Sequence, residues 1–373
     1  MQINGLCDDR FAAVREEFER NFSERDDVGA TFAATLEGDY VIDLWAGYRD
    51  GAGSIPWEED TIVNVWSTTK TMAALCALVL ADRGELDFDH RVAQYWPEYA
   101  SNGKEETLVR HFMGHTAGLP GFGEKLSKEQ LYDWDYVTKV LARQEPWWEP
   151  GTYGRYHAIT QGFLVGEIVR RITGKSLGSF FRDEIATPLQ ADFHIGVAPQ
   201  HFPRIAEILP PPPLSEAARQ QAAAAEPFPD RVNGVPAVHP PETNSAAWRQ
   251  AEIPAANGHG NARSVVRVQT LVANGGSAFG VDLLSEAGCE KIFEEQGVID
   301  GMAVHHGIGY GIARRKTRKL CFWGGAGGST IMVDVNNRAC FSYVMNRMDH
   351  NEGPGSRGDV LRERFYECLR SAG

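Results

Sequence analysis

Residues 68–83 carry the feature that most restricts what this chain can fold into. Their sequence, TTKTMAALCALVLADR, is apolar on nearly all sides at helical spacing, and Gly84 follows it as a helix stop. Such a helix offers no polar face to water, so we expect it to be buried. With 373 residues the chain is long enough to enclose it, as one large domain or as two unequal ones.

Strand signals lie towards the two ends of the chain. Residues 29–36 and 40–45 are strand-like and are separated by the turn-prone Glu37-Gly38-Asp39, which predicts a hairpin. The strand-like runs near the C-terminus are 310–313, 319–322, 329–335 and 340–344. We expect the two ends of the chain to build one antiparallel sheet.

Helical patterns dominate the middle of the chain. The predicted helices are 11–22, 107–113, 128–143, 158–173, 177–185, 262–274 and 358–371. The proline-rich stretch 199–241 is expected to be an extended surface loop, because proline excludes regular helix locally.

These patterns together predict the fold class and its division. We predict an α+β fold, with an antiparallel sheet flanked by helices plus a mostly helical lobe. Residues 1–66 and 255–373 would form a discontinuous α/β lobe, and residues 67–254 the mainly helical lobe. The active site is expected at their interface.

Composition excludes several classes of partner. The net charge of −13 at pH 7 disfavours nucleic acids and anionic membranes, whose phosphates would be repelled. The longest apolar stretch, residues 72–81, is about half a membrane span, and the acidic N-terminus is unlike a signal peptide. The six cysteines show no metal-like spacing with histidine. We therefore expect a soluble cytoplasmic protein without metal or cofactor, and its oligomeric state stays open.

The start of the buried helix also carries a candidate catalytic pair, Ser67 and Lys70. The S-x-x-K spacing places both side chains on one face of a helix, one turn apart. A lysine there can take the serine proton if burial or another cation lowers its pKa. The same spacing recurs at Ser101 and Lys104, in a polar loop that we interpret as solvated surface. The motif alone is therefore weak evidence.

A rival nucleophile is Ser176, within the G-x-S-x-G pattern of residues 174–178. That pattern marks a nucleophile elbow only between a buried strand and a helix. Here the preceding segment, FLVGEIVRRIT, is helical, so we interpret the pentapeptide as a turn between two helices.

Two further features can serve the same chemistry. Tyr156 precedes a predicted helix, and it becomes a general base if a cation such as Lys70 depresses its pKa. The glycine-dense run at 323–329, WGGAGGS, lies between two predicted strands. Glycine there lets the backbone approach a ligand and present an N–H to an oxyanion.

The order of Ser67, Lys70, Tyr156 and the glycine-dense run along the chain resembles that of the serine β-lactamase and penicillin-binding protein superfamily. More narrowly, the chain resembles the class C β-lactamase-like esterases called family VIII carboxylesterases. The resemblance covers nearly the whole chain and implies a β-lactamase-like fold. It is supported by the phrases HTAGL at 115–119, PG at 150–151, IATPL at 185–189, IPAANGH at 253–259 and YVMNR at 343–347.

The resemblance implies specific roles for these residues. Ser67 would be the acylated nucleophile and Lys70 its partner. Tyr156 corresponds to the tyrosine of the family's Y-x-N motif and would be the general base, or share that role with Lys70. The triplet Trp323-Gly324-Gly325 takes the place of K-T-G, so the oxyanion hole would be the N–H groups of Ser67 and Ala326.

Two departures from the β-lactamase pattern indicate the substrate class. The lysine and hydroxyl of K-T-G, which hold the lactam carboxylate, are absent, and Trp323 supplies a flat apolar wall instead. Ala158 replaces the asparagine of Y-x-N. Losing these polar partners should weaken binding of a charged lactam by roughly 1–3 kcal/mol for each buried contact. An uncharged ester needs neither partner.

Four more residues are candidates for the pocket lining: His157, Phe122, Asn257 and His259. His157 would orient the loop beside Tyr156. Each of these residue types is more often part of a core than of a ligand site.

The predicted function is that of a serine carboxylesterase acting on small to medium esters through an acyl-serine intermediate. The alternatives with the same chemistry are a β-lactamase, a D-amino-acid peptidase or amidase, and an acyltransferase. A non-catalytic ligand-binding relative is the alternative from another class. The presence of all three residues, Ser67, Lys70 and Tyr156, argues against it.

Overall fold

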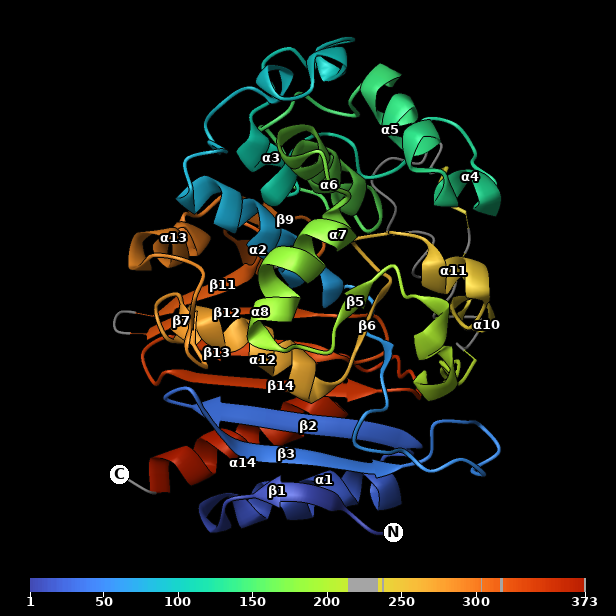
Figure 1. Ribbon diagram of the computed structural model, residues 1–373, viewed down its shortest axis with the longest axis vertical. Helices are drawn as coiled ribbons and strands as arrows, with labels where there is room; N and C mark the ends of the chain where they lie inside the picture. Colours follow the sequence, from blue (N-terminus) through green and yellow to red (C-terminus); the bar gives the residue numbers. More distant parts are fainter. Residues whose placement is uncertain (214–233, 237, 303, 316–317, 372–373) are drawn as a thin grey trace.

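A nine-stranded antiparallel sheet organises the part of the chain that the computed structural model describes, residues 1–213, 234–236, 238–302, 304–315 and 318–371 (Figure 1). Its strand order is β1-β3-β2-β14-β13-β12-β11-β10-β9. The bounds are β1 (Asn4–Cys7), β2 (Gly29–Leu36), β3 (Asp39–Gly47), β9 (Gly297–Ile299), β10 (Val304–His306), β11 (Gly311–Arg315), β12 (Arg318–Gly324), β13 (Thr330–Asp334) and β14 (Ala339–Met345).

The two ends of the chain meet in the centre of this sheet. Strand β14 pairs with β2 in a register that sets Phe341 opposite Ala34. The predicted hairpin at 29–45 is confirmed as β2 and β3. The α+β fold class, an antiparallel sheet with helices, is confirmed as well.

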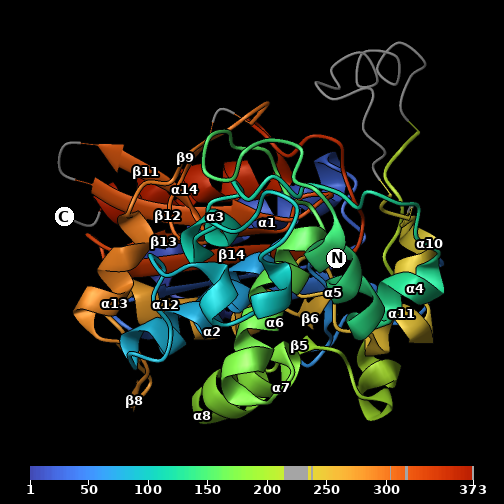
Figure 2. The ribbon, with the colours of Figure 1, turned by 90° about the horizontal axis from the view of Figure 1, so that it is seen from above.

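Helices cover both faces of the sheet, as Figure 2 shows from above. On one face lie α1 (Ala12–Glu24) and α14 (Arg357–Ser371), which pack against each other. Phe11, at the start of α1, stacks on Phe365 of α14 with ring centroids 5.1 Å apart. On the other face, α12 (Ala262–Ala273) packs against β14 and β2.

The apolar segment at 68–83 forms α2 (Thr69–Asp82), and its burial is confirmed because every residue from Thr69 to Leu80 is buried. Its neighbours are α6 (Thr160–Thr173), α7 (Leu177–Phe181) and α13 (Glu286–Glu290). Gly84, with a φ of 74°, follows its end.

The remaining helices are short, and all except α8, which lies near the centre of Figure 1, are found in its upper part or on its right side. They are α3 (Val109–Met113), α4 (Lys128–Tyr132), α5 (Trp134–Arg143), α8 (Thr187–Leu189), α10 (Pro240–Thr243) and α11 (Ala246–Gln250). None of the described helices combines the length and apolar character that crossing a bilayer requires.

Two helix predictions and one loop prediction were wrong in detail. The helix expected over 128–143 breaks at Asp133, whose carboxylate accepts a hydrogen bond from Tyr136 N and caps α5. The α-helix expected over 177–185 ends at Phe181 and continues as a π-helical turn, Arg182–Ala186. In the proline-rich stretch, Pro199–Arg204 forms a 3₁₀ helix and α10 begins at Pro240, because proline fits the first turn of a helix.

Two small sheets were not predicted. Strands β4 (Val63–Asn64), β6 (Gly258–Gly260) and β5 (His194–Ile195) form one, and β7 (Ser277–Ala278) and β8 (Val281–Asp282) form the other. The first of these fixes the segment that leads into Ser67, because Val63 and Asn64 pair with Gly260 and His259.

Candidate active site

Ser67 lies at the junction between β4 and α2. The preceding residue, Trp66, has a φ of 49°, in the left-handed region that is unfavourable for a bulky side chain. The turn is held from outside, since Val65 N donates to Gly258 O at 2.9 Å and Gly258 N donates to Thr69 Oγ1 at 2.8 Å. This arrangement leaves Ser67 partly exposed at the start of a buried helix.

Lys70 lies beneath Ser67 and is only 3% exposed. Its Nζ donates hydrogen bonds of 2.8 Å to the backbone carbonyls of Ala158 and Ala255. The same Nζ is 3.3 Å from Ser67 Oγ. Burial holds the pKa of Lys70 well below its ordinary value. The site therefore favours a neutral amine that faces the serine hydroxyl.

Tyr156 forms a second wall beside Lys70, whose Nζ is 4.7 Å from the centroid of the phenol ring. Burial raises the pKa of Tyr156 to about 12, although the Ser67 hydroxyl and the Trp323 indole approach its oxygen and act in the opposite direction. The condition under which Tyr156 would become a general base, a pKa lowered by a cation such as Lys70, is therefore not met. Burial drives Lys70 towards its neutral form, and a neutral amine exerts no charge on the phenol.

The glycine-dense turn between β12 and β13 docks directly against the approach to Ser67. A Cβ on Gly325 would overlap the Val65 carbonyl oxygen, so only glycine allows this approach. Ser329 joins the two segments, because its Oγ donates to Val65 O at 2.7 Å and is 3.0 Å from Thr68 Oγ1. Ala326, next to Gly325, is exposed at the mouth of the site.

A cavity of about 250 Å³ lies at this junction and brings most of the predicted residues together. Its lining is Ser67, Tyr156, Met302, Val304, Phe322, Trp323, Gly324, Gly325, Ala326, Gly328, Ser329, Thr330 and Glu352. Sequence reasoning missed Met302 and Val304, which come from the β9–β10 hairpin. Strands as short as β9 and β10 carry too few residues for a periodic pattern to reveal them.

The four other predicted lining residues lie elsewhere. His157, Phe122, Asn257 and His259 are fully buried and do not line this cavity. Asn257 accepts from Ile253 N at 2.9 Å and donates to Trp248 O at 2.9 Å. These contacts hold the backbone around Ala255, whose carbonyl binds Lys70.

Behind Trp323 lies a group of three buried histidines: His115, His157 and His306. The ring centroids of His306 and His115 are 5.2 Å and 6.0 Å from that of Trp323. Burial lowers the pKa of His157 to about 3 and that of His306 to about 4, so this wall is uncharged at neutral pH. Sequence reasoning missed His306. Within the described residues there is no group of three or more side chains that could hold a metal ion.

The rival serine, Ser176, has a structural role. Its Oγ caps α7 by accepting from Ser179 N at 3.2 Å, and it donates to Glu252 Oε1 at 2.6 Å. Gly174, with a φ of 72°, ends α6 ahead of it, which confirms the predicted turn between helices.

The second S-x-x-K match is not the solvated surface that we expected. Lys104 is only 1% exposed, and its Nζ donates to the carbonyl oxygens of Ser101 and Gln144 at 2.9 Å and 2.5 Å. Ser101 Oγ donates to Ala142 O at 2.9 Å. The ammonium is held by backbone carbonyls and makes no contact with that hydroxyl, so this pair joins a loop to α5.

Comparison with known proteins agrees with this geometry. The sequence model of the family described as Beta-lactamase matches residues 18–364, and the chain belongs to that family.

Three similar proteins span nearly the whole chain. The esterase/beta-lactamase LipL of Mycobacterium tuberculosis is 33% identical over 93% of this chain and 83% of its own length. The crystal structure of a family VIII carboxylesterase is 37% identical, with a TM-score of 0.89 over 99% of this chain and 100% of that one. A penicillin-binding protein homolog from Caulobacter crescentus is 33% identical, with a TM-score of 0.87 over 99% of this chain and 100% of that one.

Proposed function

We propose that this protein is a serine carboxylesterase that hydrolyses small to medium carboxylic esters, with Ser67 as its nucleophile. The observation that carries the proposal is the placement of Lys70 Nζ, 3.3 Å from Ser67 Oγ and bonded to two backbone carbonyls. A neutral amine has two N–H bonds and one lone pair. With both N–H groups given to Ala158 and Ala255, the lone pair is left for the Ser67 proton.

In the first step, Ser67 Oγ attacks the ester carbonyl and its proton passes to Lys70 Nζ. Tyr156 stays protonated at neutral pH because its pKa is about 12, so its hydroxyl donates to the leaving alcohol oxygen. The proton on Lys70 then restores the phenol. Acylation releases the neutral alcohol and leaves the acyl group on Ser67.

In the second step, water attacks the acyl-Ser67 ester and gives its proton to the same pair. Collapse of the tetrahedral intermediate breaks the bond to Ser67 Oγ, which takes back a proton as the carboxylic acid leaves. An alcohol or amine in place of water would give acyl transfer instead.

The oxyanion hole in this proposal consists of the N–H groups of Ser67 and Ala326. The close docking of Gly325 against Val65 supports it, because that approach fixes the neighbouring peptide beside the start of α2. Two aligned N–H groups stabilise the charge that develops on the carbonyl oxygen.

The cavity favours an ester over a β-lactam. Its apolar walls are Trp323, Phe322, Val304 and Met302. No lysine or arginine is among the described residues that line it, so a lactam carboxylate would lose a charged partner at a cost of roughly 1–3 kcal/mol. Lactam hydrolysis is a second, weaker activity of the same acyl-serine chemistry, in line with the double name of the relative LipL.

The test is a comparison of p-nitrophenyl acetate and butyrate with nitrocefin as substrates. Ser67→Ala should abolish ester turnover, and Ser176→Ala should retain it. Ester turnover that survives Ser67→Ala and is lost in Ser176→Ala would refute the nucleophile. Faster turnover of nitrocefin than of the esters would refute the substrate class.

A further inference from the structure

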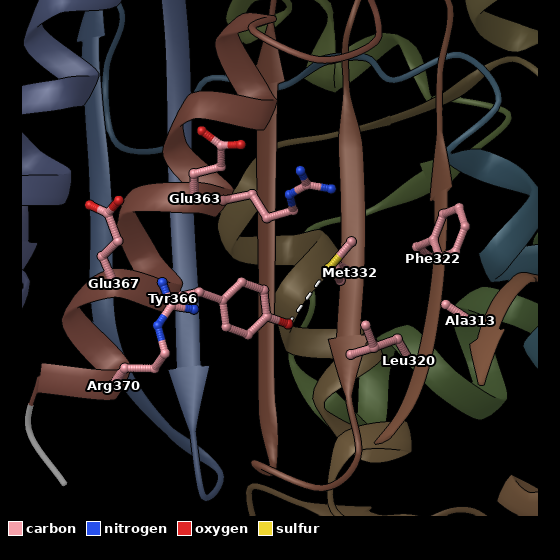
Figure 3. Close-up of a pocket in the computed structure, with 9 residues that line it drawn as sticks. Ala313, Leu320, Phe322, Met332, Glu363, Tyr366, Glu367 and Arg370 are labelled. Atoms are coloured by element: carbon pink, nitrogen blue, oxygen red, sulfur yellow. Dashed lines mark hydrogen bonds between the residues drawn. The ribbon is translucent and has the colours of Figure 1, made fainter. Parts of the chain in front are cut away.

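The cavity at Ser67 is adjacent to a second cavity, which is in turn adjacent to a third along the outer face of the sheet. It shares Phe322, Thr330 and Glu352 with a second cavity of about 250 Å³. That second cavity shares Phe322, Met332 and Arg362 with a third of about 660 Å³, drawn in Figure 3. Cavities that share lining residues in this order lie in a row from the catalytic serine to the far end of α14. We call this row the β12–β13 groove.

The floor of the groove is apolar. Leu320 and Phe322 alternate on β12 with Cys321 and Trp323, so they face outwards while their neighbours face the core. Met332 of β13 lies opposite Phe322 in the strand register, and Figure 3 shows these side chains on neighbouring strands beside α14.

Gly311 widens this floor. Gly311 pairs with Phe322, and a Cβ on Gly311 would come within 3.0 Å of the phenyl ring and 3.1 Å of Val304 Cγ1. Without a side chain at Gly311, the phenyl ring reaches across β11 towards Val304, which lines the Ser67 cavity. Phe322 thus joins the apolar wall of the catalytic cavity to the floor of the groove.

One wall of the groove is the last half of α14. Tyr366 lies along it, with its hydroxyl 3.7 Å from Met332 Sδ and 3.1 Å from Asp334 Oδ2. Most charged side chains of the groove belong to this helix, namely Asp359, Arg362, Glu363, Glu367 and Arg370. Glu352, which precedes the helix, lines the first two cavities. The apolar strands offer a contact surface for an apolar chain, while Glu363, Glu367 and Arg370 are exposed and can keep their charges in water.

We propose that the β12–β13 groove extends the substrate range beyond small to medium esters, by binding a longer acyl chain whose ester carbonyl lies at Ser67; this proposal rests on the esterase function above. The path from Gly324 back to Leu320 is four residues of extended strand, which is about 13 Å. A short acyl chain ends within the first cavity, whereas a long one continues over Phe322 and Met332. The third cavity, about 660 Å³, is within the size range of sites that bind small molecules.

The test compares kcat/KM for p-nitrophenyl dodecanoate and acetate, below the concentration at which the longer ester forms micelles. Each methylene buried in the groove should raise transition-state binding by about four-fold, until the chain passes its end. In Leu320→Arg a charge enters the floor of the third cavity, so the ratio of dodecanoate to acetate kcat/KM should fall by about ten-fold or more.

The matched control is Leu36→Arg, which places the same charge on a half-buried leucine of β2 outside the groove. The ratio should keep its wild-type value in this variant. An equal ratio in wild type and Leu320→Arg would overturn the groove while leaving acetate hydrolysis by Ser67 intact. If Ser67→Ala and Lys70→Arg both kept acetate hydrolysis, the esterase function itself would be overturned instead.

The alternative occupant of such a face is a second copy of this chain. Sedimentation of wild type and Leu320→Arg tests for it. A monomeric wild type agrees with the proposal. A wild-type dimer that Leu320→Arg dissociates, with no change in the dodecanoate ratio, would show that the groove is a subunit interface and would overturn the proposal.

Discussion

Replacing Gly325 by alanine should remove most of the esterase activity while adding a single methyl group. The new Cβ would overlap the Val65 carbonyl oxygen and the Ser329 hydroxyl, and it would come within 3.0 Å of Trp66 Cβ. Two of these atoms are backbone or bonded to backbone, so they cannot swing away as a flexible side chain would. The turn between β12 and β13 must therefore retreat from the start of α2.

The retreat carries the Ala326 N–H away from the carbonyl oxygen of the bound ester. Removing one donor of an oxyanion hole costs roughly 100- to 1,000-fold in kcat, which is about 3–4 kcal/mol of transition-state stabilisation. We expect kcat for p-nitrophenyl butyrate to fall by about that amount, with a smaller change in KM, because the donor acts mainly in the transition state.

Gly324→Ala is the matched control. A Cβ on Gly324 would meet only the Ser329 carbonyl oxygen, at an ordinary contact distance of 3.4 Å. Titration of folded active sites with a phosphonate, together with thermal unfolding, separates lost catalysis from lost folding. If folded Gly325→Ala turned over butyrate as fast as Gly324→Ala, the oxyanion reasoning would be refuted.

The contacts of the structure lead to four further predictions. Because burial lowers the pKa of Lys70, its base form is lost as pH falls through that pKa, so log kcat/KM should fall with unit slope on the acid side. Lys70→Arg, which stays protonated, should lose roughly 100- to 10,000-fold in kcat at every pH, and a surviving acid limb would contradict the assignment. Ser176→Ala should keep its ester turnover but lose about 1 kcal/mol of unfolding free energy in urea denaturation, since it removes the cap of α7. Ser329→Ala should cost more activation free energy, measured from kcat, than free energy of unfolding, because the Ser329 hydroxyl connects the β12–β13 turn to Val65 and Thr68. An unchanged kcat would argue against that connection.

The parts of the fold that the sequence could predict are those with local patterns. Helix α2 was predictable because its apolar run leaves no polar face. Strands β12 to β14 were predictable because each contains a run of apolar residues that is long enough to recognise. The small sheet of β4, β5 and β6 was not, since its strands have two or three residues and come from distant parts of the chain.

The site divides in the same way. The spacing of Ser67 and Lys70 on one helix turn is a local property, so the sequence carries it. Met302 and Val304 reach the cavity only because the β9–β10 hairpin extends the sheet beyond β11. That placement depends on tertiary packing.

The protonation of Tyr156 was the least predictable property. A nearby lysine lowers the pKa of a phenol only while the lysine is charged, and the sequence does not show whether Lys70 is buried enough to lose its proton. The burial of Lys104 was also missed, because the sequence does not show that backbone carbonyls of Ser101 and Gln144 bind its ammonium.

The most direct test of the central claim is to locate a covalent adduct by mass spectrometry after treating the protein with a p-nitrophenyl phosphonate. A phosphonate transfers its phosphorus to the nucleophile and releases p-nitrophenol, so the modified peptide identifies the attacking residue. We predict one phosphonyl group per chain, on Ser67, with no labelling in Ser67→Ala. An adduct on Ser176, or labelling that persists in Ser67→Ala, would contradict the assignment of Ser67 as the nucleophile.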